Sequence, residues 1–118
     1  MEGKVAINAH LWARDPDDWY VEPEWCSAAL FAREVFEGTI VDPFCGMGRI
    51  LDAATDAGYA GVGFDIRDRR GRPHLFQQTD FFDWPDRTRF RSIVTNPPYA
   101  GALEIVPRLV AMAEHKAA

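Results

Sequence analysis

The chain has 118 residues, of which 47% are hydrophobic and 26% charged, a composition that predicts a single globular domain. The formal net charge of −5 excludes an overall basic footprint for tight, non-specific binding to nucleic acid. No apolar run reaches the length of a membrane span and no signal-peptide pattern is present, so we expect no membrane association. Cys26 and Cys45 lack metal-ligand spacing, which predicts reduced thiols in a cytoplasmic protein and no metal site.

The N-terminal part of the chain is weakly patterned. We interpret residues 1–18 as an N-terminal arm and residues 19–118 as one domain. Within that domain, residues 19–23 (WYVEP) precede a helix expected over about 24–37. Gly38 is a natural residue to end this helix, because glycine adopts the left-handed conformation without steric cost.

The stretch Thr39–Ile50 (TIVDPFCGMGRI) organises the rest of the chain. Two β-branched residues predict a short buried strand that ends at Asp42, and Pro43 stops the strand because it has no N–H to donate. Gly46 and Gly48 form a turn, and apolar residues at helical spacing follow. A strand, a glycine turn and a helix together present free N–H groups and a positive dipole end to an anionic ligand.

The identity of that ligand follows from what the turn lacks. The third glycine of the dinucleotide fingerprint is replaced by Leu51, and no Gly-Lys-Ser/Thr of a P-loop is present. An acid at the strand end suits a ligand that carries both a cation and a carboxylate, as the amino-acid moiety of S-adenosylmethionine does. The alternative is a tight strand-to-helix turn of any α/β domain.

A second strand is expected over 60–66, with Asp65 at its end. Asp65 lies about 17 residues after Gly48, close to the about 20 typical of a ribose-binding acid. Its carboxylate can accept hydrogen bonds from both ribose hydroxyls, although a surface Asp in a loop is the alternative. The basic segment 67–74 that follows is expected to be a solvated loop, with a phosphate-contacting patch as the alternative.

A third strand is expected over 75–80 and also ends in an acid, Asp80. A carboxylate at this place can accept a hydrogen from an adenine amino group. Phe81, Phe82 and Trp84 follow, and an aromatic side chain among them can cover the adenine ring or belong to the core.

A fourth strand over 90–95 leads directly into Asn96-Pro97-Pro98-Tyr99, the most specific feature of the chain. The two prolines restrict the backbone, so the Asn96 side chain and the Pro97 carbonyl become fixed acceptors. Two such acceptors can hold both hydrogens of a planar amino group, and Tyr99 offers a flat face for stacking. The alternative is a proline-rich turn after a strand.

These motifs resemble those of class I S-adenosylmethionine-dependent methyltransferases of the NPPY amino-methyltransferase type. DPFCGMG (Asp42–Gly48) is similar to their first cofactor motif, and GFD (Gly63–Asp65) to the segment with the ribose acid. TDFF (Thr79–Phe82) is similar to the adenine-contacting segment, and NPPY (Asn96–Tyr99) to the catalytic motif. WYVEP (19–23) resembles the segment before the first strand of adenine-N6 DNA methyltransferases, which usually carries Thr where Glu stands here.

The resemblance implies S-adenosylmethionine as the cofactor and no metal. The implied cofactor-binding residues are Tyr20, Asp42, Pro43, Phe44, Gly46, Gly48, Asp65, Ile66, Asp80 and Phe81. The implied catalytic residues are Asn96, Pro97, Pro98 and Tyr99. Tyr20, taken by itself, is equally compatible with core packing and with ligand contact.

The implied reaction is N-methylation of an exocyclic amino group, with adenine N6 in DNA favoured over RNA. The alternatives are an RNA base, a protein glutamine side chain, or a catalytically incomplete cofactor-binding fragment that needs a partner chain.

The implied fold is an α/β, Rossmann-like, doubly wound parallel sheet in the strand order 3-2-1-4, without the C-terminal strands of the full methyltransferase fold. A last helix is expected over about 102–114, with Pro107 near its first turns. Strand four would then be an exposed edge, leaving Ile105, Leu109 and Met112 without cover. We therefore expect a homo-oligomer or a partner chain to cover that edge, and the alternative is that the chain is a fragment or a compact variant of the fold.

Overall fold

The computed structural model describes residues 22–69 and 75–118 of the chain. The predicted arm over 1–18 and the cofactor-binding candidate Tyr20 lie outside the described residues. Part of the basic segment, residues 70–74, lies outside them as well.

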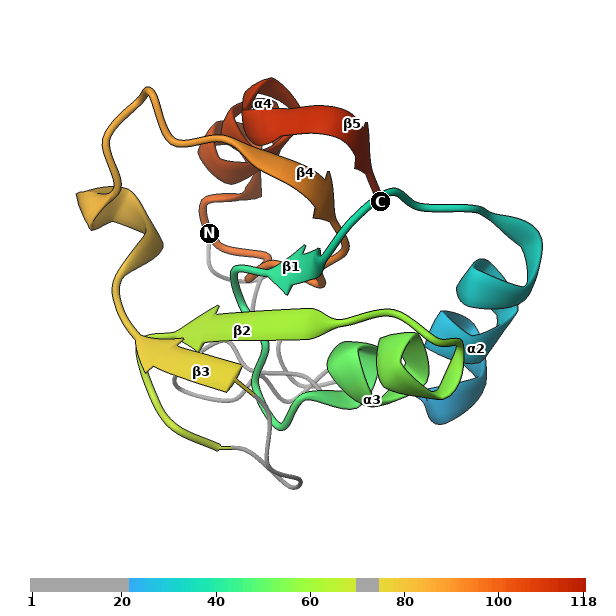
Figure 1. The fold of residues 1–118 in the computed structure, drawn as a ribbon. Coiled ribbons are helices and arrows are strands. Elements are labelled where there is room, and N and C mark those ends of the chain that lie inside the picture. Colours follow the sequence, from blue (N-terminus) through green and yellow to red (C-terminus); the bar gives the residue numbers. More distant parts are fainter. Residues whose placement is uncertain (1–21, 70–74) are drawn as a thin grey trace, which may run out of the picture.

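The described residues form an α/β fold around one parallel sheet (Figure 1). Its strand order is β3-β2-β1-β4-β5, and every neighbouring pair is parallel. The strands are β1 (Ile40–Asp42), β2 (Gly61–Asp65), β3 (Leu75–Gln78), β4 (Phe90–Ile93) and β5 (Ala113–Ala117). The predicted Rossmann-like class and the order 3-2-1-4 are confirmed, and a fifth strand is added.

The fifth strand corrects the prediction that strand four is an exposed edge. Helix α4 (Ala102–Met112) ends earlier than expected, and the chain then turns directly into β5, which pairs with β4. The register aligns Phe90 with Ala113 and Ile93 with Ala117. The sequence AEHKA consists mainly of good helix formers, so its local propensity favours a longer helix. The open side of β4 offers a row of backbone hydrogen bonds instead, and this tertiary pairing prevails.

The expectation that the apolar positions of the last helix lack cover was also wrong. Ile105, Leu109 and Met112 are buried and pack with Phe81 and Ile93 in one core cluster. This face of α4 lies against the sheet, while Pro107 is accommodated inside the helix. The apolar periodicity of the helix is therefore satisfied within the chain itself.

Helix α2 (Glu24–Arg33) is shorter than the predicted helix over 24–37. After Arg33 the backbone becomes extended, because two tertiary hydrogen bonds replace helical ones. The N–H of Phe36 donates to the Tyr59 hydroxyl at 3.0 Å, and the Ser92 hydroxyl donates to the Glu37 carbonyl at 2.6 Å. Gly38 has a positive φ of 72° as predicted, but within this bend rather than at a helix end.

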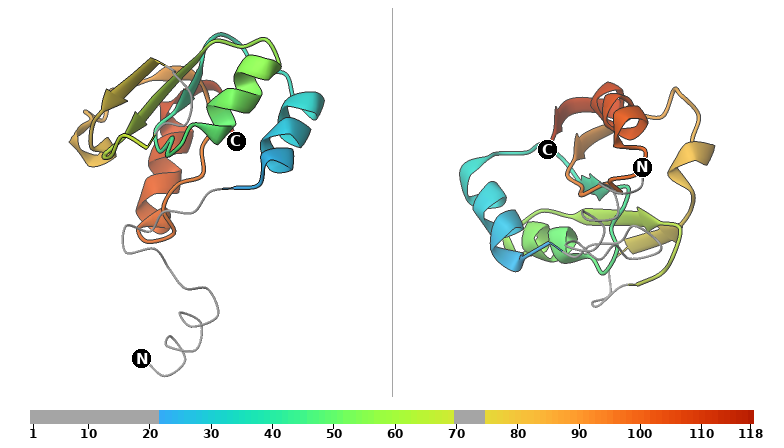
Figure 2. Two further views of the ribbon diagram at one scale, coloured as in Figure 1. Left: turned by 90° about the horizontal axis from the view of Figure 1, so that it is seen from below. Right: turned by 180° about the vertical axis from the view of Figure 1, so that it is seen from behind.

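Helices cover both faces of the sheet, as Figure 2 shows from two further directions. Ile93 is the last residue of β4 and Val94 follows it, so their side chains point to opposite faces of the sheet. Ile93 packs with α4, whereas Val94 packs with the cluster of α2 and α3 (Arg49–Asp56). The chain thus leaves β1 toward one face and β4 toward the other.

This arrangement creates a topological switch point between β1 and β4. In open parallel sheets, ligands bind beyond the carboxyl ends of the strands at such a point. The glycine turn follows β1, and Asn96–Tyr99 follows β4. The fold therefore brings these two sequence motifs together. None of the helices in the described part of the chain is long and apolar enough to cross a membrane.

Candidate functional site

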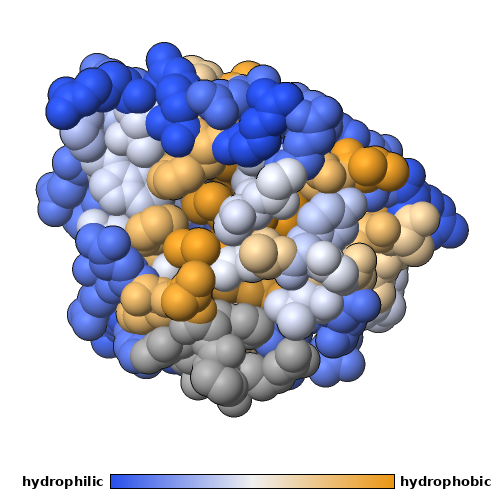
Figure 3. Space-filling model, in the orientation of Figure 1, coloured by the Kyte–Doolittle hydropathy of each residue, from blue (hydrophilic) through white to orange (hydrophobic). Residues whose placement is uncertain are grey.

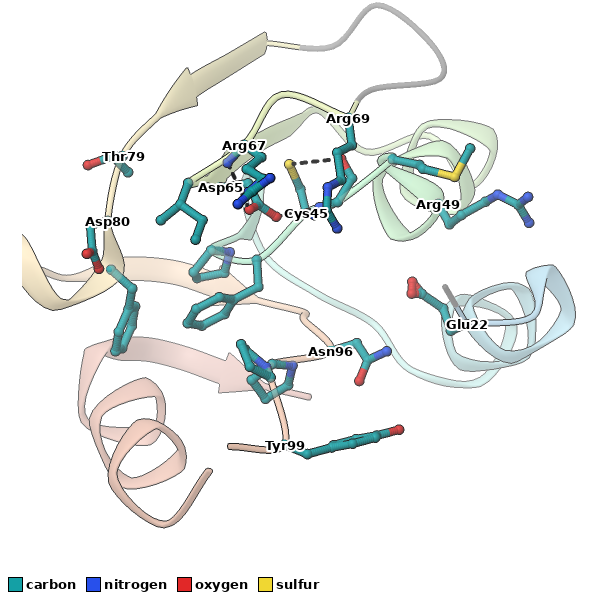
Figure 4. A pocket seen from close by; sticks show the side chains of 18 of the residues that line it. Glu22, Cys45, Arg49, Asp65, Arg67, Arg69, Thr79, Asp80, Asn96 and Tyr99 are labelled. Carbon is teal, nitrogen blue, oxygen red and sulfur yellow. Dashed lines mark hydrogen bonds between the residues drawn. The ribbon is translucent and has the colours of Figure 1, made fainter. Parts of the chain in front are cut away.

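A cavity of about 220 Å³ lies at the carboxyl ends of β1 to β4 (Figure 4). It lies where the fold places the topological switch point, and the segments that follow all four strands contribute to its wall. Its lining residues are Glu22, Pro43, Phe44, Cys45, Gly46, Met47, Arg49, Asp65, Ile66, Arg67, Arg69, Thr79, Asp80, Phe81, Phe82, Asn96, Pro97, Pro98 and Tyr99.

The glycine turn forms one wall of the cavity. Gly46 and Gly48 have positive φ values of 53° and 88°, a backbone region that side chains with a Cβ rarely adopt. The N–H of Gly46 donates to Asp65 Oδ2 at 2.8 Å, and the N–H of Cys45 donates to the Phe64 carbonyl at 2.9 Å. The turn is thereby fastened to the end of β2. Gly48 itself does not line the cavity but precedes α3 as its N-cap residue.

A glycine of β2, outside the glycine turn, makes this close approach feasible. An added Cβ at Gly63 of β2 would lie 2.7 Å from Cys45 Sγ and 2.8 Å from Leu51 Cδ1. Both distances are shorter than van der Waals contact, so a side chain at 63 would push the turn and α3 away from the sheet. Gly63 therefore supports the site from beneath.

Asp65 lies where the ribose acid was predicted, at the end of β2 and on the cavity wall. One oxygen accepts from Gly46 N–H, and the other accepts from Arg67 N–H at 3.2 Å. Because each carboxylate oxygen has two lone pairs, both oxygens keep acceptor capacity for a ligand. Two backbone amides thus fix the orientation of a carboxylate that borders the cavity.

Asp42 does not line the cavity, although the sequence predicted it at the cofactor. It is 1% exposed beneath the glycine turn. Its Oδ1 accepts from the Thr95 hydroxyl at 2.5 Å and from Phe44 N–H at 3.1 Å, while Oδ2 has no hydrogen-bond partner among the described residues. Burial is the main cause that raises the pKa of Asp42 to about 7, against the opposing effect of these two donors. Asp42 joins the end of β1 to the residue before Asn96.

The residues that were predicted as candidates for contact with adenine follow β3. Asp80 Oδ1 accepts from Phe82 N–H at 2.9 Å and so caps the short 3₁₀ helix Phe81–Asp83. Phe81 belongs to the core and the cavity wall at once, whereas Phe82 is 48% exposed beside the cavity. Trp84 does not line the cavity but packs edge-on against Phe64, with ring centroids 4.9 Å apart.

All four residues of the Asn96–Tyr99 motif line the cavity. The Val94 N–H bonds to the Val41 carbonyl at 3.0 Å, so pairing with β1 continues almost to the motif. Figure 4 shows the Asn96 amide and the Tyr99 ring on the side opposite Asp65, with the Glu22 side chain directed toward the same space. Tyr99 is 52% exposed and presents its ring at the opening.

Several lining residues were not among the predicted site residues. Arg67 and Arg69 belong to the basic segment for which a solvated loop was expected and a phosphate-contacting patch was the alternative, and both line the cavity. Arg49 and Glu22 add a further positive and a negative charge. The signal that could have identified Arg49 and Arg67 was their place directly after a strand-end motif, and for Glu22 it was the segment WYVEP.

The cavity combines fixed carboxylates, an apolar wall and amide acceptors. Asp65 and Asp80 suit hydroxyl and amino donors, while the apolar wall suits a flat ring such as a purine. The Arg side chains and the glycine turn suit a carboxylate. Across residues 22–69 and 75–118, no group of three or more His, Cys, Asp or Glu side chains is arranged to hold a metal ion. Seen in the orientation of Figure 1, hydrophilic side chains gather along the upper edge of the molecule, while apolar side chains reach the surface in the middle (Figure 3).

Of the comparisons with known proteins, the comparison of structures finds similar proteins, and the comparisons of sequence do not. No protein-family model and no curated protein sequence matches it. A solved structure that is similar is that of the plantazolicin methyltransferase BpumL in complex with SAH, with a TM-score of 0.52 and 14% sequence identity. The match covers 77% of this chain and 40% of the other, so the chain spans less than half of that protein. Over that shared part, the two chains have the same Rossmann-like fold.

Proposed function

We propose that the chain binds S-adenosylmethionine and transfers its methyl group to an exocyclic amino nitrogen, most favourably adenine N6 in DNA. One observation carries the proposal: the glycine turn, Asp65, Asp80 and Asn96–Tyr99 surround a single cavity. The shared fold with a methyltransferase that was solved with SAH adds support. Because the chain corresponds to 40% of that protein, activity of this chain alone is part of the proposal.

The residues of the cavity suit each part of the cofactor. Asp65 would accept the ribose hydroxyls, and Asp80 would accept a hydrogen of the adenine amino group. Ile66 and Phe81 would contact the adenine ring from the apolar wall. The turn at Gly46 would take the methionine part, with Asp42 beneath it. Tyr20 lies outside the described residues, and its contact with the cofactor stays a proposal from the sequence.

The catalytic part of the proposal concerns the target amino group. When bound, S-adenosylmethionine supplies an electrophilic methyl group on a sulfonium centre. The Asn96 side-chain oxygen and the Pro97 carbonyl would accept the two amino hydrogens, which holds the nitrogen lone pair toward that methyl group. Pro98 would stiffen this segment, and Tyr99 would stack on the extruded base. Water can take the proton, because methylation acidifies the amino group.

The substrate could also be an RNA base or a protein glutamine, since both present a planar amino group. We rank DNA as the first candidate substrate because of the resemblance to adenine-N6 DNA methyltransferases. The positive charges of Arg67 and Arg69 at the cavity edge would help with phosphates despite the net charge of −5. Cys26 and Cys45 form no disulfide, which fits the proposed cytoplasmic location.

The test separates cofactor binding from methyl transfer. Titration calorimetry with S-adenosylmethionine, S-adenosylhomocysteine and NAD should show binding of the two sulfur ligands only. The Asp65→Asn variant should weaken that binding, and Asp83→Asn, an exposed acid next to the site, serves as its matched control. Labelled cofactor with DNA, RNA and protein pools should then label DNA. Binding of NAD alone would reject the cofactor, and label confined to protein glutamine would reject the adenine substrate.

A further inference from the structure

Arg108 of α4 reaches from outside the cavity to the segment that forms its aromatic wall. Its side chain is partly buried, and the guanidinium carbon lies 4.8 Å from the centroid of the Phe81 ring and 5.9 Å from that of Phe82. Its Nη2 donates to the Trp84 carbonyl at 3.2 Å and lies 4.0 Å from Asp86 Oδ1. One side chain thus contacts four residues of the segment 81–86.

That segment has little internal support. Its regular part is the three-residue 3₁₀ helix Phe81–Asp83, and such helices have poor hydrogen-bond geometry. Phe81 is secured by the core cluster around Ile105 and Leu109. Phe82, by contrast, is 48% exposed and packs edge-on against the Phe81 ring at 5.5 Å. A fixed cation at these rings would therefore matter most for Phe82.

The same segment contains the residues proposed to meet the adenosine half of the cofactor. Phe82 N–H donates to Asp80 Oδ1, so the placement of Phe82 and the orientation of the Asp80 carboxylate depend on each other. Phe81 and Phe82 both line the cavity, and Arg108 does not. An effect of Arg108 on the ligand would have to pass through these residues.

We propose that Arg108 is a positioning residue for the adenosine-binding wall, because its cation and its bond to the Trp84 carbonyl hold Phe82 and Asp80 in their binding arrangement. This role rests on the proposed function, since it requires an adenosyl ligand in the cavity. A cation over an aromatic face attracts the ring quadrupole, and a planar guanidinium can do so while donating a hydrogen bond in its own plane. Arg108 meets both conditions.

The test compares three variants of the full chain by their affinity for S-adenosylhomocysteine and for free adenosine. Arg108→Gln should weaken both affinities about tenfold, the loss expected from one partly desolvated cation–π contact. Arg108→Lys keeps the cation and should restore both to within about threefold of the wild type. Arg89→Gln is the matched control. Arg89 donates to the carbonyls of Asp86 and Thr88 at 2.8 Å but does not line the cavity, so its loss should leave both affinities unchanged.

Two further readouts separate positioning from general destabilisation. In a Phe82→Leu background, Arg108→Gln should cause a clearly smaller additional loss of affinity, because the contact with the Phe82 ring is gone while the bond to the Trp84 carbonyl remains. In the ligand-free chain, Arg108→Gln should speed hydrogen exchange of the Phe82 and Trp84 amides and leave the amides of β1 unchanged.

The outcomes against the proposal are distinct. If the wild type binds and Arg108→Gln stays within about twofold of its affinity, the positioning role is overturned. The same follows if Arg108→Gln loses as much affinity in the Phe82→Leu background, or if Arg89→Gln weakens binding equally. A wild type that binds neither S-adenosylhomocysteine nor adenosine would overturn the proposed function, and this role with it.

Discussion

At the scale of single residues, the candidate site depends on acids that the backbone holds in place. Asp65 accepts two backbone N–H groups, and Asp80 accepts one. A carboxylate fixed in this way loses little conformational entropy when a ligand donor arrives. The acids that end β2 and lie beyond β3 therefore serve both the fold and the cavity.

Asn96 should affect the rate more than the affinity. Under the proposed function, Asn96→Ala removes an acceptor that acts on the target nitrogen, and we expect a loss of about 10²–10³ in kcat, as for an oxyanion-hole donor. The affinity for S-adenosylhomocysteine should stay close to that of the wild type. Single-turnover methyl transfer and calorimetry on the same sample measure both. Unchanged kcat in Asn96→Ala would remove Asn96 from the catalytic set.

Tyr99 should affect substrate binding through its ring. Tyr99→Ala should cost about 1–3 kcal/mol of stacking with the extruded base, and Tyr99→Phe should keep most of it. The binding of an oligonucleotide that carries an unpaired adenine measures this difference. Equal losses in the two variants would indicate that the hydroxyl group matters rather than the ring.

Asp42 should make stability depend on pH. Because burial raises the pKa of Asp42 from 3.8 to about 7, the folded chain keeps a proton that the unfolded chain releases. The contribution of this proton to the free energy of unfolding is fully present below the pKa of Asp42 in the unfolded chain. It is lost as the pH rises through the pKa in the folded chain, and the total loss is at most about 4 kcal/mol. Urea titrations should thus give a lower free energy of unfolding at about pH 8 than at about pH 5. Asp42→Asn should reduce this difference, and an unchanged difference would contradict the assignment.

At the scale of elements, α4 and β5 complete the fold on the side of β4. The inner face of α4 contributes to the cluster that holds Phe81, and β5 occupies the edge of β4. The same helix carries Arg108, so one element supports both the sheet edge and the aromatic wall of the cavity.

This cover can be tested with two leucines of α4. Leu109 is 5% exposed and Leu103 is 96% exposed. Leu109→Ala should lower the free energy of unfolding by about 2–5 kcal/mol, because it leaves a cavity in the core. Leu103→Ala should change it by less than about 0.5 kcal/mol. Denaturant unfolding of the two variants gives the comparison, and equal effects would contradict the packing of α4.

At the scale of the whole molecule, the open edge of the sheet on this side is β5, and not β4 as the sequence had predicted. Among the described strands, β5 pairs with β4 alone, and its outer side has a row of backbone groups open to another strand. The proposed homo-oligomer or partner chain would therefore meet β5. Exposed apolar residues on the neighbouring helix would add to such an interface, namely Leu103, Val106 and Val110.

We expect the purified chain to have a solution mass above that of a monomer. Light scattering measures the mass, and a methyl-transfer assay on the same species measures its activity. Leu103→Lys places a charge on a fully exposed position and should shift the population toward monomer without unfolding the chain. A folded monomer that binds the cofactor and transfers no methyl group would favour the incomplete fragment.

The sequence by itself was sufficient for the parts of the fold that local patterns encode. Short strands that end in Asp42 and Asp65, and glycines at positive φ, are features of a few adjacent residues. The sheet order 3-2-1-4 is what the resemblance to class I methyltransferases implies, and the observed sheet contains it. The same topology predicts that the motif Asn96–Tyr99 meets the glycine turn.

Only the tertiary structure decided the features that depend on distant partners. The segment 113–117 became a strand because β4 offered it hydrogen bonds, against the helical propensity of its own residues. Asp42 was drawn under the turn by the Thr95 hydroxyl, 53 positions away in sequence, and not into the cavity. Arg108 reached the wall because α4 and Phe81 pack in the same core cluster. Local propensities are worth less than about 1 kcal/mol per residue, so contacts such as these outweigh them wherever the fold brings their partners together.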